Sequence, residues 1–102
     1  MTPTFQVGEA KFEYATTGRG PDVMLLHAGI ADRRMWEPQL PHFARNFRVT
    51  TYDLRGFGQS PMVAGPYAHY RDLHALLDQL GVERAALVGA SMGGSVAIDF
   101  TL

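Results

Sequence analysis

The chain has 102 residues, 46% of them hydrophobic, which suits one small domain over residues 1–102 with a core of its own. A formal net charge of −1 without a basic run argues against nucleic acid or an anionic membrane as a partner. Cysteine is absent, which excludes a disulfide framework and a thiolate zinc site and leans mildly toward the cytoplasm. No apolar run approaches the length of a membrane span, and no signal peptide is visible. We expect neither a cofactor nor a metal.

The first elements are short strands. Residues 4–7 and 11–16 are predicted to be extended, the second with polar and apolar side chains in alternation, and Gly8-Glu9 between them suits a hairpin. A turn cluster at residues 17–22 follows. Residues 23–26 (Val-Met-Leu-Leu) are apolar without interruption, which is typical of a strand buried on both faces in a parallel sheet.

The next segment combines a helix and a strand. Trp36, Leu40, Phe43 and Phe47 form one helical stripe, and Pro41 predicts that this helix is kinked or divided into two pieces. Residues 48–52 are β-branched and aromatic, and they predict a strand.

The second half repeats the alternation. A helix is expected with Pro66 at its N-terminus, because Leu73, Leu76, Leu77 and Leu80 share helical spacing and Gly81 can end it. Residues 85–88 predict a strand, and residues 93–102 a further helix. The order of elements predicts an α/β fold with a mostly parallel five-stranded sheet and helices on its faces.

Residues 89–93 (Gly-Ala-Ser-Met-Gly) fit the pattern G-x-S-x-G between a strand and a helix. A sharp turn there needs small neighbours, which Gly89 and Gly93 supply. It would lift the Ser91 hydroxyl clear of the sheet and leave the Met92 N–H at a helix N-terminus. Ser91 is therefore the candidate nucleophile.

Three glycine-containing loops follow the predicted parallel strands: residues 27–32, 53–60 and 89–93. Ligand sites of such sheets lie at the carboxyl ends of the strands. We therefore expect the three loops to converge on a common site.

These loops resemble motifs of the α/β-hydrolase family. Residues 25–29 (Leu-Leu-His-Ala-Gly) are similar to its oxyanion loop, where the usual form is His-Gly. Residues 53–60 (Asp-Leu-Arg-Gly-Phe-Gly-Gln-Ser) match its D-x-R-G-x-G-x-S loop, and residues 89–94 its nucleophile elbow. The resemblance covers the whole chain but at most the N-terminal half of a usual member. It implies a truncated α/β-hydrolase fold that lacks the C-terminal strands, the lid, and the acid and histidine loops.

The resemblance also implies roles for individual residues. Ser91 would be the nucleophile, and the N–H groups of Met92 and Gly29 would form the oxyanion hole, with Ile30 as the alternative to Gly29. Family members that open epoxides or dehalogenate use aspartate at the elbow, so Ser91 favours acyl substrates. The expected activity is a carboxylesterase-like hydrolysis of small carboxylic esters through an acyl-enzyme.

The general base is an open question, because the family's histidine follows its serine and no histidine follows Ser91 here. His27 is the first candidate, and its structural alternative is a ring bonded to a loop carbonyl. His69 is expected to pack, and His42 and His74 to be solvated. The chain would be a fragment of a longer enzyme, a miniature hydrolase with another base, or a non-catalytic binding module that keeps the fold.

Other polar residues near the loops have structural interpretations. Asp53 and Arg55 are expected to brace their loop by pairing with each other and with the backbone, and Asp32 to cap a helix or orient His27. The strand at residues 85–89 would be an open apolar edge, which predicts a homo-oligomer.

Overall fold

A computed structural model describes residues 2–63 and 65–101 of the chain. The elements in order are β1 (Thr4–Val7), β2 (Ala10–Thr17), β3 (Asp22–Leu26), the 3₁₀ helix η1 (Arg33–Trp36), α1 (Leu40–Phe43), β4 (Arg48–Tyr52), α2 (His69–Leu80), β5 (Ala85–Gly89) and α3 (Met92–Thr101). The predicted alternation of strands and helices is confirmed, with Leu102 of the last predicted helix outside the described residues.

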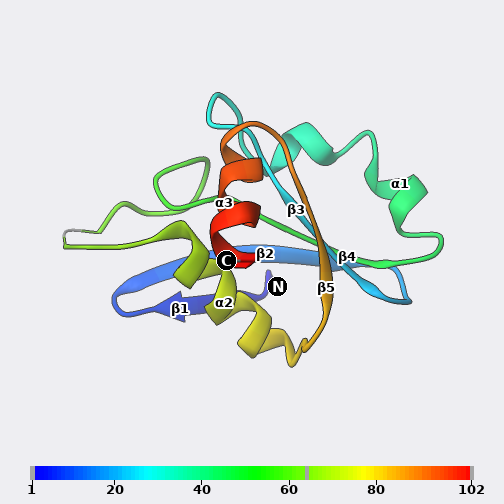
Figure 1. The fold of residues 1–102 in the computed structure, drawn as a ribbon, viewed down its shortest axis with the longest axis horizontal. Helices are drawn as coiled ribbons and strands as arrows, with labels where there is room; N and C mark the ends of the chain where they lie inside the picture. The colour runs from blue at the N-terminus through cyan, green and yellow to red at the C-terminus, as the bar shows by residue number, and fades with distance from the viewer. Residues whose placement is uncertain (1, 64, 102) are drawn as a thin grey trace.

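The five strands form one mixed sheet in the order β1-β2-β4-β3-β5 (Figure 1). Strand β3 pairs in parallel with β4 and with β5, whereas β2 is antiparallel to both β1 and β4. Four strands consequently share one direction and β2 alone opposes them, so the sheet is mostly but not purely parallel. The Gly8-Glu9 hairpin is confirmed, because Val7 pairs with Ala10 across it and Gly8 has a φ of 59°.

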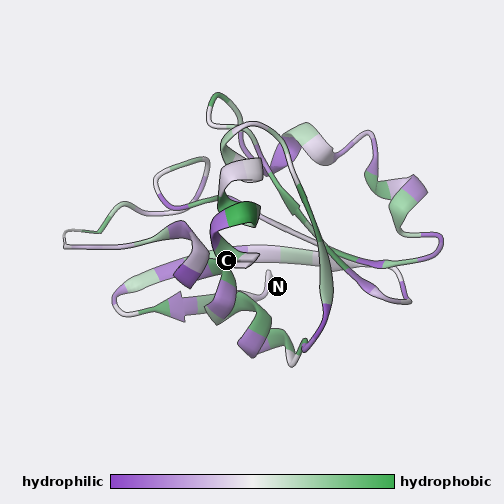
Figure 2. Ribbon diagram, in the orientation of Figure 1, coloured by the Kyte–Doolittle hydropathy of each residue, from purple (hydrophilic) through white to green (hydrophobic). Residues whose placement is uncertain are grey.

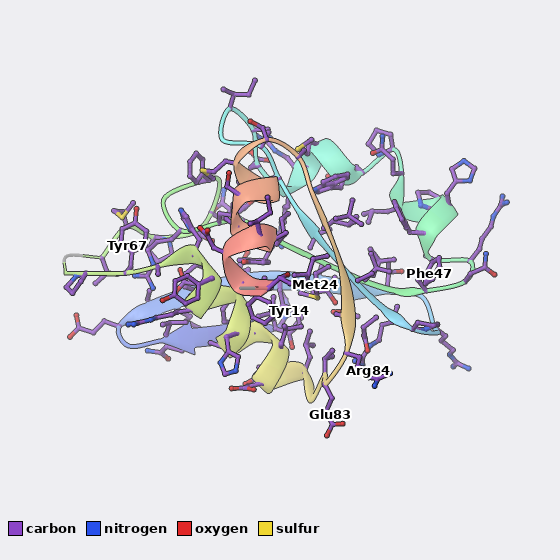
Figure 3. All side chains as sticks on the ribbon, in the orientation of Figure 1. Tyr14, Met24, Phe47, Tyr67, Glu83 and Arg84 are labelled. Carbon is purple, nitrogen blue, oxygen red and sulfur yellow. The ribbon has the colours of Figure 1, made fainter. Side chains whose placement is uncertain are left out.

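The sheet has a hydrophobic layer on each face. Met24 and Leu26 of β3 point into the larger core, which α2 and α3 cover. Val23 and Leu25 point to the other face and pack with Val49, under Trp36 and Phe43 of η1 and α1. Figure 2 shows the hydrophobic colour along β3, and on α2 it shows hydrophobic and polar residues in alternation. Figure 3 labels Met24 near the centre of the molecule. A strand apolar on both faces thus lies between two helical layers, as its sequence predicts.

Two predicted helices differ in detail from the structure. The stripe from Trp36 to Phe47 is divided into η1 and α1, and Pro41 lies in the first turn of α1, where its missing N–H leaves no hydrogen bond unmade. Helix α2 begins at His69 instead of at Pro66, because Ala68 is still extended, with φ −146° and ψ 132°. Gly81 ends α2 in the left-handed conformation, as expected.

Strand β5 lies at an edge of the described sheet. None of its five residues is fully buried, whereas four of the five residues of β3 are. The homo-oligomer expected from this edge stays a prediction. Among the described residues, no helix combines the length and hydropathy that a membrane span requires.

Candidate active site

The three predicted loops meet at the carboxyl ends of β3, β4 and β5. The backbone N–H of Leu54 donates to His27 Nε2 over 2.9 Å, which joins the loop after β4 to the loop after β3. The N–H of Ala90 donates to the Leu26 carbonyl over 3.1 Å, which joins the loop after β5 to the same strand. These bonds confirm that the loops form one cluster.

Ser91 stands on a strained turn between β5 and α3. Its φ is +54°, and among residues 2–63 and 65–101 it is the one non-glycine residue in the left-handed region. Such a conformation costs roughly 1–3 kcal/mol and persists only where the surrounding structure enforces it. The residue is exposed. A serine held at this cost on an exposed strand-to-helix bend has the backbone expected of a nucleophile elbow.

The glycines around Ser91 enforce this bend by close packing. A Cβ on Gly93 would lie 2.1 Å from the Leu26 carbonyl oxygen, and one on Gly89 would lie 2.3 Å from the Gly93 carbonyl oxygen. Neither distance is possible for a real side chain, so the start of α3 rests directly on the backbone of β3 and β5. The sequence prediction that Gly89 and Gly93 allow close approach is confirmed.

The two predicted oxyanion donors lie next to each other. A Cβ on Gly29 would be 3.4 Å from both Cβ and Sδ of Met92, so the loop after β3 touches the residue that follows Ser91. Met92 is the first residue of α3, where N–H groups lack intrahelical acceptors. The neighbouring amides of Ala90 and Gly93 are already bonded, to the carbonyls of Leu26 and Ala90. Gly29 and Met92 thus lie side by side, next to Ser91.

His27 is fully buried at the end of β3, and both of its ring nitrogens are engaged. Nε2 accepts from the Leu54 N–H over 2.9 Å, and Nδ1 lies 2.8 Å from the Ala28 carbonyl oxygen. An amide can only donate and a carbonyl can only accept, so the ring is neutral with its proton on Nδ1. A general base needs a free lone pair within reach of the proton that it removes. This geometry does not support His27 as the base and fits the loop-carbonyl alternative.

The other histidines lie on helices. His69 opens α2 with its ring 5.4 Å from that of Tyr67, and Figure 3 shows Tyr67 on the loop before this helix. Burial lowers the pKa of His69, because it disfavours the charged ring. His74 is exposed and lies 3.5 Å from Asp78 one turn later, and His42 is exposed on α1. The predicted packing role of His69 and the solvated positions of His42 and His74 agree with these environments.

Asp53 braces its loop through the backbone. Its carboxylate accepts from the N–H of Arg33 over 2.8 Å and from the N–H of Gln59 over 2.9 Å. A Cβ on Gly58 would lie 2.3 Å from that carboxylate, so only glycine fits beside it. Asp53 therefore ties the loop after β4 to the start of η1.

Arg55 does not pair with Asp53, and that part of the prediction is wrong. Its guanidinium instead forms a bidentate pair with Asp72 of α2, at 2.9 and 2.8 Å, between the rings of Phe12 and Tyr67. Sequence reasoning missed Asp72, although an acid beside the Leu73–Leu76 stripe near a helix start was a usable sign. Asp32 caps η1 as predicted, by accepting from the Arg34 N–H.

A comparison with protein families gives this site its class. The model of the alpha/beta hydrolase fold matches residues 21–100, which include all three loops. The chain therefore belongs to the alpha/beta hydrolase family, as its motifs predicted.

Individual relatives share part of their length with the chain. It is 35% identical over 80 residues to 3-oxoadipate enol-lactonase 1 of Acinetobacter baylyi, covering 76% of the chain and 30% of that protein. It is 33% identical to epoxide hydrolase 3 of Siraitia grosvenorii, covering 97% of the chain and 33% of the relative. The chain thus spans about a third of the length of these curated relatives.

Solved structures give the same result. An enol-lactonase from Burkholderia xenovorans superposes with a TM-score of 0.87 at 33% identity, over 94% of the chain and 40% of that structure. A structure described as an N-acyl homoserine lactone degrading enzyme superposes with a TM-score of 0.91 at 33% identity, over 97% of the chain and 39% of that structure. The fold class predicted from the sequence is confirmed.

Proposed function

We propose that this chain carries the nucleophile and the oxyanion hole of a serine hydrolase that acts on small carboxylic esters, lactones included. The strained backbone of Ser91, held between β5 and α3 beside Gly29 and Met92, is the observation that carries the proposal. Relatives named as lactonases extend the expected substrates to cyclic esters. A serine at the elbow favours acyl transfer over the epoxide opening named for another relative.

The proposed reaction is an acyl transfer through Ser91. The Ser91 hydroxyl oxygen attacks the ester carbonyl carbon, its proton passes to a general base, and the carbonyl oxygen becomes an oxyanion held by two amides. Collapse breaks the bond to the alcohol, which leaves with a proton, and water then hydrolyses the acyl-enzyme. A single preset oxyanion donor commonly contributes about 10²–10³ in rate. The proposal does not assign His27 as the base, because both of its ring nitrogens are engaged.

Hydrolysis of p-nitrophenyl acetate by the protein expressed from its complete gene tests the proposal. We expect turnover that Ser91→Ala abolishes and that Ser95→Ala, one turn along α3, leaves nearly unchanged. Equal rates for the wild type and Ser91→Ala would overturn it.

The alternative of a non-catalytic binding module predicts a different outcome. A module of that kind would leave Ser91 unreactive toward a fluorophosphonate probe. We expect labelling of the wild type and of Ser95→Ala, and none of Ser91→Ala.

A further inference from the structure

His27 lies where the three loops join, and its ring has little freedom to turn. The side chain is fully buried, and its ring packs edge-on against Phe57, with centroids 5.5 Å apart and planes at 68°. Leu54, whose N–H donates to Nε2, is also fully buried. The acceptor at Nε2 and the contact with Phe57 thus hold the Nδ1–H in a fixed direction.

That Nδ1–H points at the carbonyl oxygen of Ala28, 2.8 Å away. The same oxygen accepts from the Ala31 N–H over 3.1 Å, which closes a turn over residues 28–31 with Gly29 and Ile30 at its centre. The Ala28 N–H is tied as well, to the Met35 sulfur at 3.3 Å. The carbonyl and the N–H of Ala28 are therefore each bonded to a side chain outside the turn, those of His27 and Met35.

Fixing the Ala28 carbonyl also fixes the Gly29 amide. The two groups belong to one planar trans peptide, in which the C=O and the N–H point in opposite directions. A bond that holds the oxygen on the His27 side therefore directs the Gly29 N–H to the other side. Glycine at position 29 would otherwise leave this peptide with unusual rotational freedom.

We infer that His27 is a positioning residue for the oxyanion hole, acting through its Nδ1–H on the Ala28–Gly29 peptide. This inference rests on the proposed function of Ser91 and Gly29. It replaces the expected role of His27 as a base with a role that needs a neutral ring and no proton transfer. It differs from simple packing, because it depends on the hydrogen-bond donor at Nδ1 and not only on the volume of the ring.

Substitutions of His27 by residues with an amide side chain distinguish the roles of the two ring nitrogens. Asparagine places an amide N–H near the Nδ1 position, and glutamine reaches the Nε2 position, where its oxygen can accept from Leu54. Phenylalanine keeps the ring volume and removes both bonds. We expect His27→Asn to retain kcat within a few-fold, and His27→Gln and His27→Phe to lose about 10²-fold in kcat with little change in KM.

Each kinetic outcome has a separate meaning. Equal kcat for His27→Asn and His27→Gln would overturn the inference. A fall of all three His27 variants to the activity of Ser91→Ala would also overturn it, because that result is expected of a general base. Failure of the wild type to hydrolyse any ester would instead count against the proposed function.

Nitrogen-15 NMR tests the inference without catalysis. We expect imidazole spectra of the wild type to show the ring proton of His27 on Nδ1. The order parameter of the Gly29 amide should fall in His27→Gln and stay unchanged in His27→Asn. A proton on Nε2, or equal Gly29 order in both variants, would overturn the inference even if Ser91 proved catalytic.

Discussion

At the scale of single residues, Ser91 adopts a backbone conformation that glycine takes without penalty and serine does not. Its identity therefore matters for chemistry and works against stability. For His27 the reverse holds. Two hydrogen bonds occupy both ring nitrogens, so the ring is not available as a base, and the same bonds order the loops around it. Both residues lie in motifs visible in the sequence. Ser91 has the tight turn that its motif predicts, and His27 has the bond to a loop carbonyl that was its structural alternative.

Relieving the strain at Ser91 should stabilise the protein. We expect Ser91→Gly to raise the free energy of unfolding by about 1 kcal/mol, because a Cβ in the left-handed region costs roughly that amount. Ser91→Ala keeps the Cβ and should show no such gain. Urea denaturation of the two inactive variants measures the difference, and equal stabilities would show that the turn is not strained.

The cap at Asp32 should make a pH-dependent contribution. Hydrogen bonds from the Arg34 side chain and then from its backbone N–H lower the pKa of Asp32 to about 2, from about 3.9 in an unfolded chain. A carboxyl whose pKa is lowered by folding stabilises the fold above its unfolded pKa, and loses that effect as pH falls through its folded pKa.

Comparing wild type with Asp32→Ala isolates this effect. Their difference in unfolding free energy, measured by urea denaturation, should be full at pH 5 and clearly smaller at pH 3. A difference that stays constant over this range would contradict the assigned pKa.

At the scale of elements, the contact between α3 and the sheet depends on the absence of side chains. A Cβ on Gly93 would meet the Leu26 carbonyl oxygen at 2.1 Å, whereas one on Gly94 would lie 3.6 Å from the nearest atom, the Gly89 oxygen. Gly93→Ala should therefore destabilise the protein by about 1–3 kcal/mol or more. Gly94→Ala is the matched control and should be neutral or stabilising, since alanine favours helices. Thermal denaturation that ranked the two variants equally would refute this packing.

A buried ion pair joins the loop after β4 to helix α2. The Arg55 and Asp72 side chains are 7% and 1% exposed. Removing one partner therefore leaves the other as an unpaired charge buried away from water. We expect Asp72→Ala to cost about 3–5 kcal/mol of unfolding free energy, and the double variant Arg55→Met with Asp72→Leu to cost much less. A single variant within 1 kcal/mol of wild type would show that the pair is solvated.

At the scale of the whole molecule, the periodic and motif-bearing segments could be predicted from the sequence. The apolar run of β3, the leucine stripe of α2 and the elbow at Ser91 each depend on local spacing, and the structure bears them out. The pairing of Arg55 with Asp72 joins residues 17 positions apart, and the bond from the Leu54 N–H to His27 Nε2 joins residues 27 positions apart. No local pattern specifies such partners, because only the packing of loops on helices brings them together.

The central claim is that the Ser91 oxygen forms a covalent acyl bond during turnover. Mass spectrometry of the protein from its complete gene, quenched in acid while it hydrolyses p-nitrophenyl acetate, tests this most directly. We predict a peptide that begins at Ala85, heavier by one acetyl group, with fragment ions that place the added mass on Ser91. An unmodified Ser91 during sustained, enzyme-dependent turnover, or an acetyl group found only on Ser95, would contradict the account.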